Sequence, residues 1–371
     1  MRLWDVKARQ GHSLHQMCPY QGSFPPQLPA FFLDQFPEAQ VVLDPFVGRG
    51  TVALEAMLRG KTFYGVDVNP VALALSRVKV DCAQQAEVVA EIDALDLTGT
   101  APSPPDDVEP FFHPKTWQQV YNLRESDLSP TLTALVLGRL HGHSSGFFST
   151  TTFNVISVHG KSLRKLKQKH GTEAEFRDVP TILTKAAQRF IPDLGLVGNG
   201  TIQAGDARKL PIEDNSVDMV ITSPPFLDVI DYADVNWLRL WFLKGESPPT
   251  FIRGSDTYRE FLQDCLRELA RVVKPTGHIV FEVGPVKQNM ALSDLVVEMA
   301  EGILQLEQVV KNTFDEAGVP KISRAMQKGK KTTTMSNDCV ILKRLDSTVP
   351  DLKLVVEQPS NPIMDLFGGD S

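Results

Sequence analysis

Three acidic residues stand at the ends of apolar segments, where they could bind a ligand that carries several polar groups. Asp44 follows the apolar residues 41–43, and Asp67 and Asp206 each close a later apolar run. Acids at the tips of neighbouring parallel strands meet at one edge of a sheet, where a carboxylate can accept hydrogen bonds from ribose hydroxyls. The other two carboxylates suit an amine and the amino group of an adenine. S-adenosylmethionine carries all three groups.

A glycine-containing loop follows Asp44 at once. Residues 45–51 read Pro-Phe-Val-Gly-Arg-Gly-Thr, and the glycines let backbone N–H groups lie close to a bound ligand. The loop is not a dinucleotide-binding GxGxxG sequence, because no third glycine stands three positions after Gly50. An ordinary strand-to-helix turn is the alternative, and the neighbouring acids favour a binding site. The candidate cofactor-binding residues here are Asp44, Phe46, Gly48, Gly50, Thr51, Asp67 and Asp206.

Residues 223–226 read Ser-Pro-Pro-Phe and follow directly from an apolar run. Two prolines fix the backbone and remove two N–H donors, so this rigid tip presents carbonyl oxygens as acceptors. A planar ring could stack on Phe226 while its amino group donates to the Ser223 hydroxyl and the Pro224 carbonyl. Those bonds free the lone pair of the amino nitrogen from the ring, so that the nitrogen could attack the methyl carbon of a sulfonium in line with the sulfur. No covalent enzyme intermediate is needed. A proline turn that only closes a strand is the alternative. The candidate catalytic residues are Ser223, Pro224, Pro225 and Phe226.

The elements that must position these residues follow from hydrophobic periodicity. Short apolar runs predict strands at residues 41–43, 62–68, 201–206, 216–222, 278–283 and 338–342. Helical spacing predicts helices at residues 52–58, 72–80, 116–123 and 132–140 and from Tyr258 onward. The alternation of strand and helix predicts an α/β fold with a largely parallel sheet.

The alternation breaks between the second and third strands, which predicts an insertion. This stretch holds a proline-rich linker at residues 101–107 and no regular strand pattern. We therefore expect the first part of an α/β domain at residues 1–81, an insertion at residues 82–200, the second part of the domain at residues 201–350, and a flexible tail at residues 351–371.

The segments at the strand tips resemble the motifs of the S-adenosylmethionine-dependent DNA amino-methyltransferases. The sequence Asp-Pro-Phe-x-Gly-x-Gly-Thr at residues 44–51 is similar to motif I of that family, and residues 66–70 and 205–207 are similar to its second and third motifs. The resemblance implies a class I, Rossmann-like methyltransferase fold with a mostly parallel seven-stranded sheet and helices on both faces.

The same resemblance implies a role for each matched residue. It places Asp44 by the methionine amine of S-adenosylmethionine and Asp67 at the ribose, with Phe46 and Asp206 at the adenine. Residues 18–25 resemble motif X, which covers the methionine end and adds Phe24 to the candidate cofactor-binding residues. They depart from the common form, because Ser23 stands where a lysine is frequent. An N-terminal arm that is simply packed is the alternative.

Thr-Ser-Pro-Pro-Phe resembles motif IV of the enzymes that methylate cytosine at N4. Adenine-N6 enzymes more often carry Asp or Asn at the position of Ser223, and the usual aromatic of the N4 enzymes is Tyr, where this chain has Phe226. The resemblance thus implies a site-specific DNA cytosine-N4 methyltransferase. The target cytosine must be flipped out or already single-stranded, because a base within a duplex cannot reach such a pocket. The alternatives are methylation of adenine N6 or of an RNA base amino group, and a non-catalytic nucleic-acid-binding module.

The charge pattern is compatible with DNA as the partner. Acidic residues outnumber basic ones by 45 to 38, so the chain is not a basic DNA-coating protein. Its bases nevertheless gather in two runs, for which solvated surfaces are the alternative. The first run lies in the insertion, which is then the expected target-recognition domain. The two runs are Lys161, Arg164, Lys165, Lys167 and Lys169, and Lys321, Arg324, Lys328, Lys330 and Lys331.

The remaining expectations concern partners and compartment. A cognate restriction endonuclease is a candidate partner, and residues 363–367 resemble the peptides that bind sliding clamps, although a chance apolar cluster is the alternative. Four separated cysteines with no CxxC spacing argue against a disulfide framework and against a metal site. No signal sequence or membrane-spanning run is visible. We expect a soluble, cytoplasmic, nucleoid-associated bacterial protein that does not bind membranes.

Overall fold

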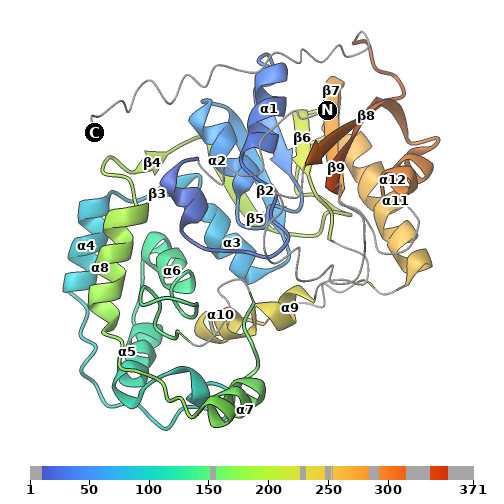
Figure 1. The fold of residues 1–371 in the computed structure, drawn as a ribbon. Coiled ribbons are helices and arrows are strands. Elements are labelled where there is room, and N and C mark those ends of the chain that lie inside the picture. The colour runs from blue at the N-terminus through green and yellow to red at the C-terminus, as the bar shows by residue number, and fades with distance from the viewer. Residues whose placement is uncertain are drawn as a thin grey trace.

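The computed structural model describes residues 11–150, 156–225, 231–246, 252, 254–283, 292–314 and 335–349. None of the helices in these ranges is both long and apolar enough to cross a bilayer. The chain forms one large sheet with helices on its two faces and a group of helices beside it (Figure 1).

The central sheet has seven strands in the order β5-β2-β1-β6-β7-β9-β8. They are β1 (Val41–Asp44), β2 (Thr62–Asp67), β5 (Gly200–Ala204), β6 (Val217–Thr222), β7 (Val273–Val283), β8 (Leu304–Phe314) and β9 (Met335–Arg344). The first five strands in that order run parallel, whereas β9 is antiparallel to both of its neighbours. This open, mixed sheet is the class I methyltransferase fold that the sequence predicted.

Helices cover both faces of the sheet, because its central strands are apolar on both sides. Neighbouring residues of a strand point to opposite faces. In β1, Val42 packs into the cluster that contains the residues of α1 and α2, and Leu43 packs into the cluster of α11 and α12. The helices are α1 (Gln27–Gln35), α2 (Thr51–Leu58), α11 (Ser255–Val272) and α12 (Leu292–Ala300).

Each strand predicted from an apolar run is present, and β8 is the strand of the central sheet that the prediction missed. Its sequence carries Gln, Glu, Lys and Asn between its apolar residues, so it lacks the continuous apolar run of the buried strands. It lies at the edge of the sheet, where β9 is its one neighbour. An edge strand tolerates such polar residues, because it is less enclosed than a central strand.

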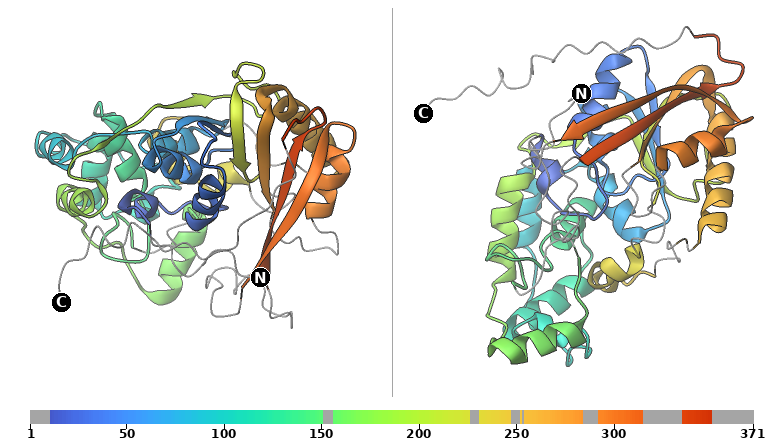
Figure 2. Two further views of the ribbon diagram at one scale, coloured as in Figure 1. Left: turned by 90° about the horizontal axis from the view of Figure 1, so that it is seen from above. Right: turned by 45° about the vertical axis from the view of Figure 1, so that its right-hand side comes forward.

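A helical insertion, residues 83–195, leaves the sheet after helix α3 (Pro70–Arg77) and returns just before β5 (Figure 2). Its two ends are joined, because β3 (Asp81–Cys82) and β4 (Leu196–Val197) pair as antiparallel strands. Between them lie α4 (Gln85–Asp93), η2 (Glu109–Phe111), α5 (Pro114–Glu125), α6 (Pro130–Leu137), α7 (Gly160–His170) and α8 (Val179–Phe190). Helices α4, α7 and α8 were not among those predicted.

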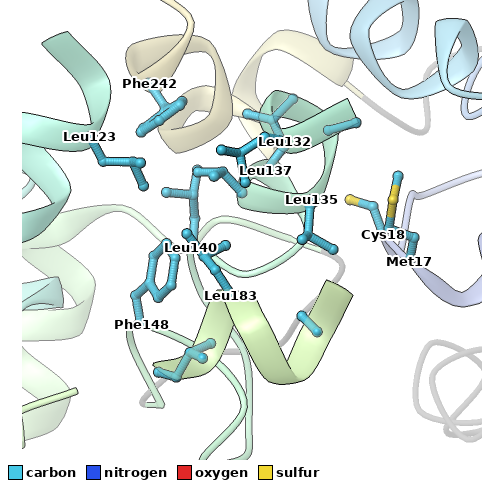
Figure 3. Close-up of a cluster of buried hydrophobic side chains, with 14 of the residues drawn as sticks. Met17, Cys18, Leu123, Leu132, Leu135, Leu137, Leu140, Phe148, Leu183 and Phe242 are labelled. Carbon is cyan, nitrogen blue, oxygen red and sulfur yellow. The ribbon is translucent and has the colours of Figure 1, made fainter. Parts of the chain in front are cut away.

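The helical insertion shares one apolar core with other parts of the chain. Leu123, Leu135 and Leu183 of the insertion lie in the same buried cluster as Phe242 of α10 (Trp237–Phe242). Met17 and Cys18, which come from the N-terminal segment after the short helix η1 (Ser13–Gln16), join this cluster beside Leu135 (Figure 3). The insertion is therefore packed onto the rest of the molecule rather than tethered to it. A further short helix, α9 (Tyr232–Val235), precedes α10.

Candidate active site

A cavity of about 430 Å³ opens where β1, β2, β5 and β6 end. Strand β1 lies between β2 and β6, so the order of the strands reverses there, and ligands bind α/β sheets at such a point. Gly50 and Pro224 lie in the same loops without lining the cavity, and Phe226 lies outside the described residues. The predicted site residues that line the cavity are Phe24, Asp44, Phe46, Gly48, Thr51, Asp67, Asp206, Ser223 and Pro225.

Asp44 is a buried carboxylate at the end of β1. Its Oδ1 accepts hydrogen bonds from the Thr222 hydroxyl at 2.6 Å and from the Phe46 N–H at 3.1 Å. Burial nevertheless raises the pKa of Asp44 to about 7, because it penalises the charged form more than these bonds favour it. The carboxylate is therefore disposed to accept a further donor or a cation from the cavity.

Asp67 lies at the end of β2 with both oxygens facing backbone N–H groups. Its Oδ2 accepts from the N–H of Gly48 at 3.0 Å, and its Oδ1 accepts from the N–H of Asn69 at 2.9 Å. Burial raises the pKa of Asp67 to about 6 in spite of these bonds. A carboxylate oxygen has two lone pairs, so each oxygen can accept one more hydrogen bond, as a pair of neighbouring hydroxyls requires.

Gly50 keeps the loop after β1 close to helix α3. Its φ is +79°, in the left-handed region that favours glycine. A Cβ at this position would lie 2.9 Å from the Ser76 Cα and 2.8 Å from the Lys79 Cγ. A side chain here would therefore push the loop away from α3 and disturb Gly48 and Asp67. Gly50 therefore sets the position of the loop that lines the cavity, although Gly50 itself does not line it.

Asp206 lies at the far side of the cavity and is paired with Arg208. The guanidinium donates to it from Nε at 3.0 Å and from a terminal nitrogen at 2.6 Å, and these bonds hold its pKa below the usual value. Phe46 and Phe261 lie nearby, with ring centroids 5.9 Å apart. This part of the wall offers aromatic faces beside an anionic group, which suits a flat base with an amino group.

Ser223 and Glu282 form a hydrogen-bonded pair at the ends of β6 and β7. Burial raises the pKa of Glu282 to about 7, and the hydrogen bond from Ser223 opposes that shift. A carboxylate only accepts, so the Ser223 hydroxyl is the donor when Glu282 is ionised. The lone pairs of its oxygen then remain to accept from a group in the cavity. Glu282 is 5% exposed and therefore buried beneath the cavity wall rather than on the surface.

The proline tip, which is the Ser-Pro-Pro segment at residues 223–225, is held in place by helix α11. The Tyr258 hydroxyl donates to the Pro225 carbonyl at 3.0 Å, and Tyr258 itself is buried in the core. The sequence predicted Tyr258 only as a helix residue. A contact across 33 positions leaves no signature in local sequence. Arg208, which pairs with Asp206 at the cavity, was also not predicted as a site residue.

The N-terminal segment forms one wall of the cavity through residues 20–24. Tyr20 is 8% exposed and its hydroxyl accepts a hydrogen bond from the Asn69 side chain at 3.3 Å. Its ring stacks on Tyr232 with centroids 6.3 Å apart. The segment is thus packed against the protein and also part of the cavity wall. A packed N-terminal arm and a segment that covers the cofactor, the two alternatives from the sequence, are therefore compatible.

The first basic run lies on helix α7 of the insertion. The buried residues of this helix are Gly160 and Leu163, and its lysines are exposed or half-buried. Arg164 donates to the Asp106 carbonyl and pairs with Glu109 at 3.3 Å. The second basic run and the tail segment at residues 363–367 lie outside the described residues.

Comparisons with known proteins agree with this geometry. A family model described as DNA methylase, of the N6 and N4 methyltransferases, matches residues 1–77. The type II methyltransferase M.MjaII of Methanocaldococcus jannaschii is 36% identical over 79 residues, which are 21% of this chain and 15% of that protein. M.BsoBI of Geobacillus stearothermophilus is 22% identical over 281 residues, 65% of this chain and 55% of that protein. The similarity to the N6/N4 DNA methylase family thus covers residues 1–77.

The matched residues include Asp44, the glycine loop and Asp67. The chain spans 15% to 55% of the length of the curated relatives it matches. Among solved structures, a geranyl diphosphate methyltransferase in complex with GPP and sinefungin shows 9% identity and a TM-score of 0.38, covering 86% of this chain and 79% of its own.

The residues present fit S-adenosylmethionine, the cofactor expected for this family. The buried carboxylate of Asp44 and the half-buried carboxylate of Asp67 face one cavity, and among the described contacts neither has a cationic side chain as hydrogen-bond partner. An ammonium group and a pair of ribose hydroxyls supply the donors that they would accept. Nowhere in the described ranges do three or more His, Cys, Asp or Glu side chains gather in a way that could hold a metal ion.

Proposed function

We propose that this protein transfers a methyl group from S-adenosylmethionine to the exocyclic N4 amino group of a cytosine in DNA. The observation that carries this proposal is that the carboxylates at the ends of β1 and β2 and the Ser-Pro-Pro tip at the end of β6 line the same cavity. A cofactor site and a base site that share one cavity are what a direct transfer between two bound groups requires.

The cofactor half of the proposal rests on Asp44, Asp67 and the loop between them. Asp67 holds the ribose through its two hydroxyls, and Asp44 lies toward the methionine amine. When bound, S-adenosylmethionine would supply a methyl group whose carbon an amine nitrogen can attack, while the C–S bond breaks and the positively charged sulfur leaves as a neutral thioether. The methylated nitrogen then loses a proton to water. The aromatic wall made by Phe46 and Phe261 takes the adenine, with Asp206 toward its amino group.

The base half rests on the orientation of Ser223. Because its hydroxyl donates to Glu282, its oxygen accepts a hydrogen bond from the amino group of the target base. The Pro224 carbonyl is the second acceptor in this proposal, and Phe226 supplies the stacking surface. When the amino group donates a hydrogen bond to each of these two acceptors, its lone pair is drawn out of conjugation with the ring. The nitrogen is then a better nucleophile. Glu282 is a positioning residue in this scheme.

DNA approaches the cavity with the target base out of the stack. The exposed lysines of α7 supply contacts to the phosphates, which fix the position of a duplex without reading its sequence. The helical insertion to which α7 belongs is the target-recognition part in this proposal. Cytosine is favoured over adenine because a serine leads the tetrapeptide at residues 223–226.

The test is nucleoside mass spectrometry of plasmid DNA from cells that express the protein. N4-methylcytosine supports the proposal, and N6-methyladenine without it would overturn the choice of base. Bound S-adenosylmethionine with no modified base would favour the non-catalytic alternative.

Two variants separate the two halves of the site. Ser223→Ala should lower turnover by about 100-fold while cofactor affinity stays within about 2-fold of wild type. Asp67→Ala should weaken cofactor binding by at least about 10-fold, because the ribose loses a charged acceptor. Calorimetric titration with S-adenosylmethionine and single-turnover methylation measure the two effects. Wild-type turnover in Ser223→Ala would refute its catalytic role.

A further inference from the structure

The N-terminal arm, defined as residues 12–24, connects the helical insertion to the cavity. Its last five residues form a wall of the cavity, and the residues before them run against the insertion. Met17 is fully buried in the same apolar cluster as Leu135 of α6 (Figure 3). Only Cys18 and Pro19 lie between Met17 and Tyr20, so a shift of the arm at Met17 would move the cavity wall.

The side chains of four basic residues donate hydrogen bonds to backbone carbonyls of the arm. Two of them lie in the first part of the α/β domain. Lys79 donates to the Leu14 carbonyl at 2.7 Å, and Arg49 donates to the His15 carbonyl at 2.9 Å. The other two bind nearer to the cavity. They are Arg139 of the insertion, which donates to the Met17 carbonyl at 2.9 Å, and Arg239 of α10, which donates to the Pro19 carbonyl at 3.3 Å.

Arg139 is built for this contact. It is 7% exposed, and its guanidinium lies over the rings of Phe147 and Phe190, 4.5 and 5.0 Å from their centroids. Burial is the main reason that its pKa is lowered to about 10, so it remains a cation at neutral pH. Within the described ranges no carboxylate acts on it. The Met17 carbonyl is thus the acceptor toward which the insertion directs this charge.

The backbone before Arg139 gives a second, independent sign of the same contact. A Cβ at Gly138 would lie 2.4 Å from the Met17 carbonyl oxygen, so the arm and the insertion approach as closely as a glycine allows. A further bond joins them where the Ser13 hydroxyl donates to the Phe190 carbonyl at 2.8 Å.

We propose that the helical insertion is part of the cofactor site, and that Arg139 is a positioning residue that holds the cavity wall in place for S-adenosylmethionine. This inference rests on the proposed function. It assigns to the insertion a task separate from DNA recognition, because the arm must be held whether or not DNA is present. Loss of the Arg139 contact should therefore weaken cofactor binding by the DNA-free protein.

The experiment is calorimetric titration of the full chain with S-adenosylmethionine in the absence of DNA. Arg139→Gln should bind at least about 10-fold more weakly than wild type. The matched control is Arg189→Gln, because Arg189 also lies over the Phe190 ring, at 5.1 Å, but is exposed and makes no described contact with the arm. Arg189→Gln should bind within about 2-fold of wild type.

Kinetics distinguish positioning from a general loss of structure. In Arg139→Gln the KM for S-adenosylmethionine should rise about 10-fold while kcat at saturating cofactor stays within about 3-fold. Wild-type affinity in Arg139→Gln, or an equal loss in Arg189→Gln, would overturn the inference. If Arg139→Gln does not fold, Gly138→Ala displaces the arm at the same contact, and wild-type affinity in that variant overturns the inference as well. A wild-type protein that binds no S-adenosylmethionine would instead refute the proposed function.

Discussion

Asp44 and Asp67 are placed in the site at a cost to folding. Their ordinary pKa is 3.8, and in the folded chain burial raises it to about 7 for Asp44 and to about 6 for Asp67. Between the two values the folded state binds more protons than the unfolded state, so stability falls as pH rises through this window. Above pH 7 the penalty is complete, and for Asp44 it amounts to a few kcal/mol. A cationic ligand relieves it.

This leads to a prediction at the residue scale. Asp44→Asn should stabilise the ligand-free protein by about 1–3 kcal/mol at pH 8, because an amide oxygen can still accept from Thr222 and Phe46 without carrying a buried charge. The gain should shrink as pH falls toward 4, where Asp44 is protonated. The variant should also lose affinity for S-adenosylmethionine. Urea unfolding at several pH values measures the first effect.

The control for this prediction is Asp93→Asn, at an exposed position on α4, which should change stability by less than about 0.5 kcal/mol. An Asp44→Asn protein that is less stable than wild type at pH 8 would contradict the argument.

At the scale of elements, the site depends on strand ends that helices hold from behind. Residue types and spacing were enough to predict the strands that end at Asp44 and Asp67, because a buried parallel strand is a continuous apolar run. They were not enough for β8, whose polar residues fit an edge, or for the contacts of Glu282 and Tyr258. Those contacts join positions that are far apart in the chain, so only the packed structure brings them together.

The brace between α11 and the proline tip gives the prediction at this scale. Tyr258→Phe removes the bond to the Pro225 carbonyl and leaves a buried acceptor without its donor. We expect stability to fall by about 1–2 kcal/mol. Turnover should fall by about 3- to 10-fold with unchanged cofactor affinity, because the tip is less firmly placed.

Tyr64→Phe is the matched control, since Tyr64 also packs against the core from β2 and no hydrogen bond of its hydroxyl is described. Thermal unfolding and single-turnover methylation measure the two effects. Full turnover in Tyr258→Phe, with the loss of stability seen, would show that the brace serves the fold alone.

At the scale of the whole molecule, charge is segregated. The formal net charge is −7, but acids at the strand tips face the cavity while α7 presents a run of bases on the helical insertion. Figure 1 shows α7 at the end of the insertion away from α4 and the β3–β4 pair, on the side of α9 and α10. An acidic protein can therefore bind DNA through a bounded basic face.

The last prediction concerns this face. Each lysine that neutralises a phosphate releases condensed counterions, so the logarithm of the binding constant falls linearly with the logarithm of salt concentration. Lys161→Gln and Lys165→Gln should each weaken binding to a duplex, and each should reduce the steepness of that dependence by about 1. Lys185→Gln, an exposed lysine of α8, should leave both unchanged. Fluorescence anisotropy with a labelled duplex between 50 and 200 mM salt, roughly the range over which such binding changes most, measures the slope. A slope that stays the same in both α7 variants would mean that the basic run of α7 is a solvated surface, and that DNA reaches the cavity along a different face.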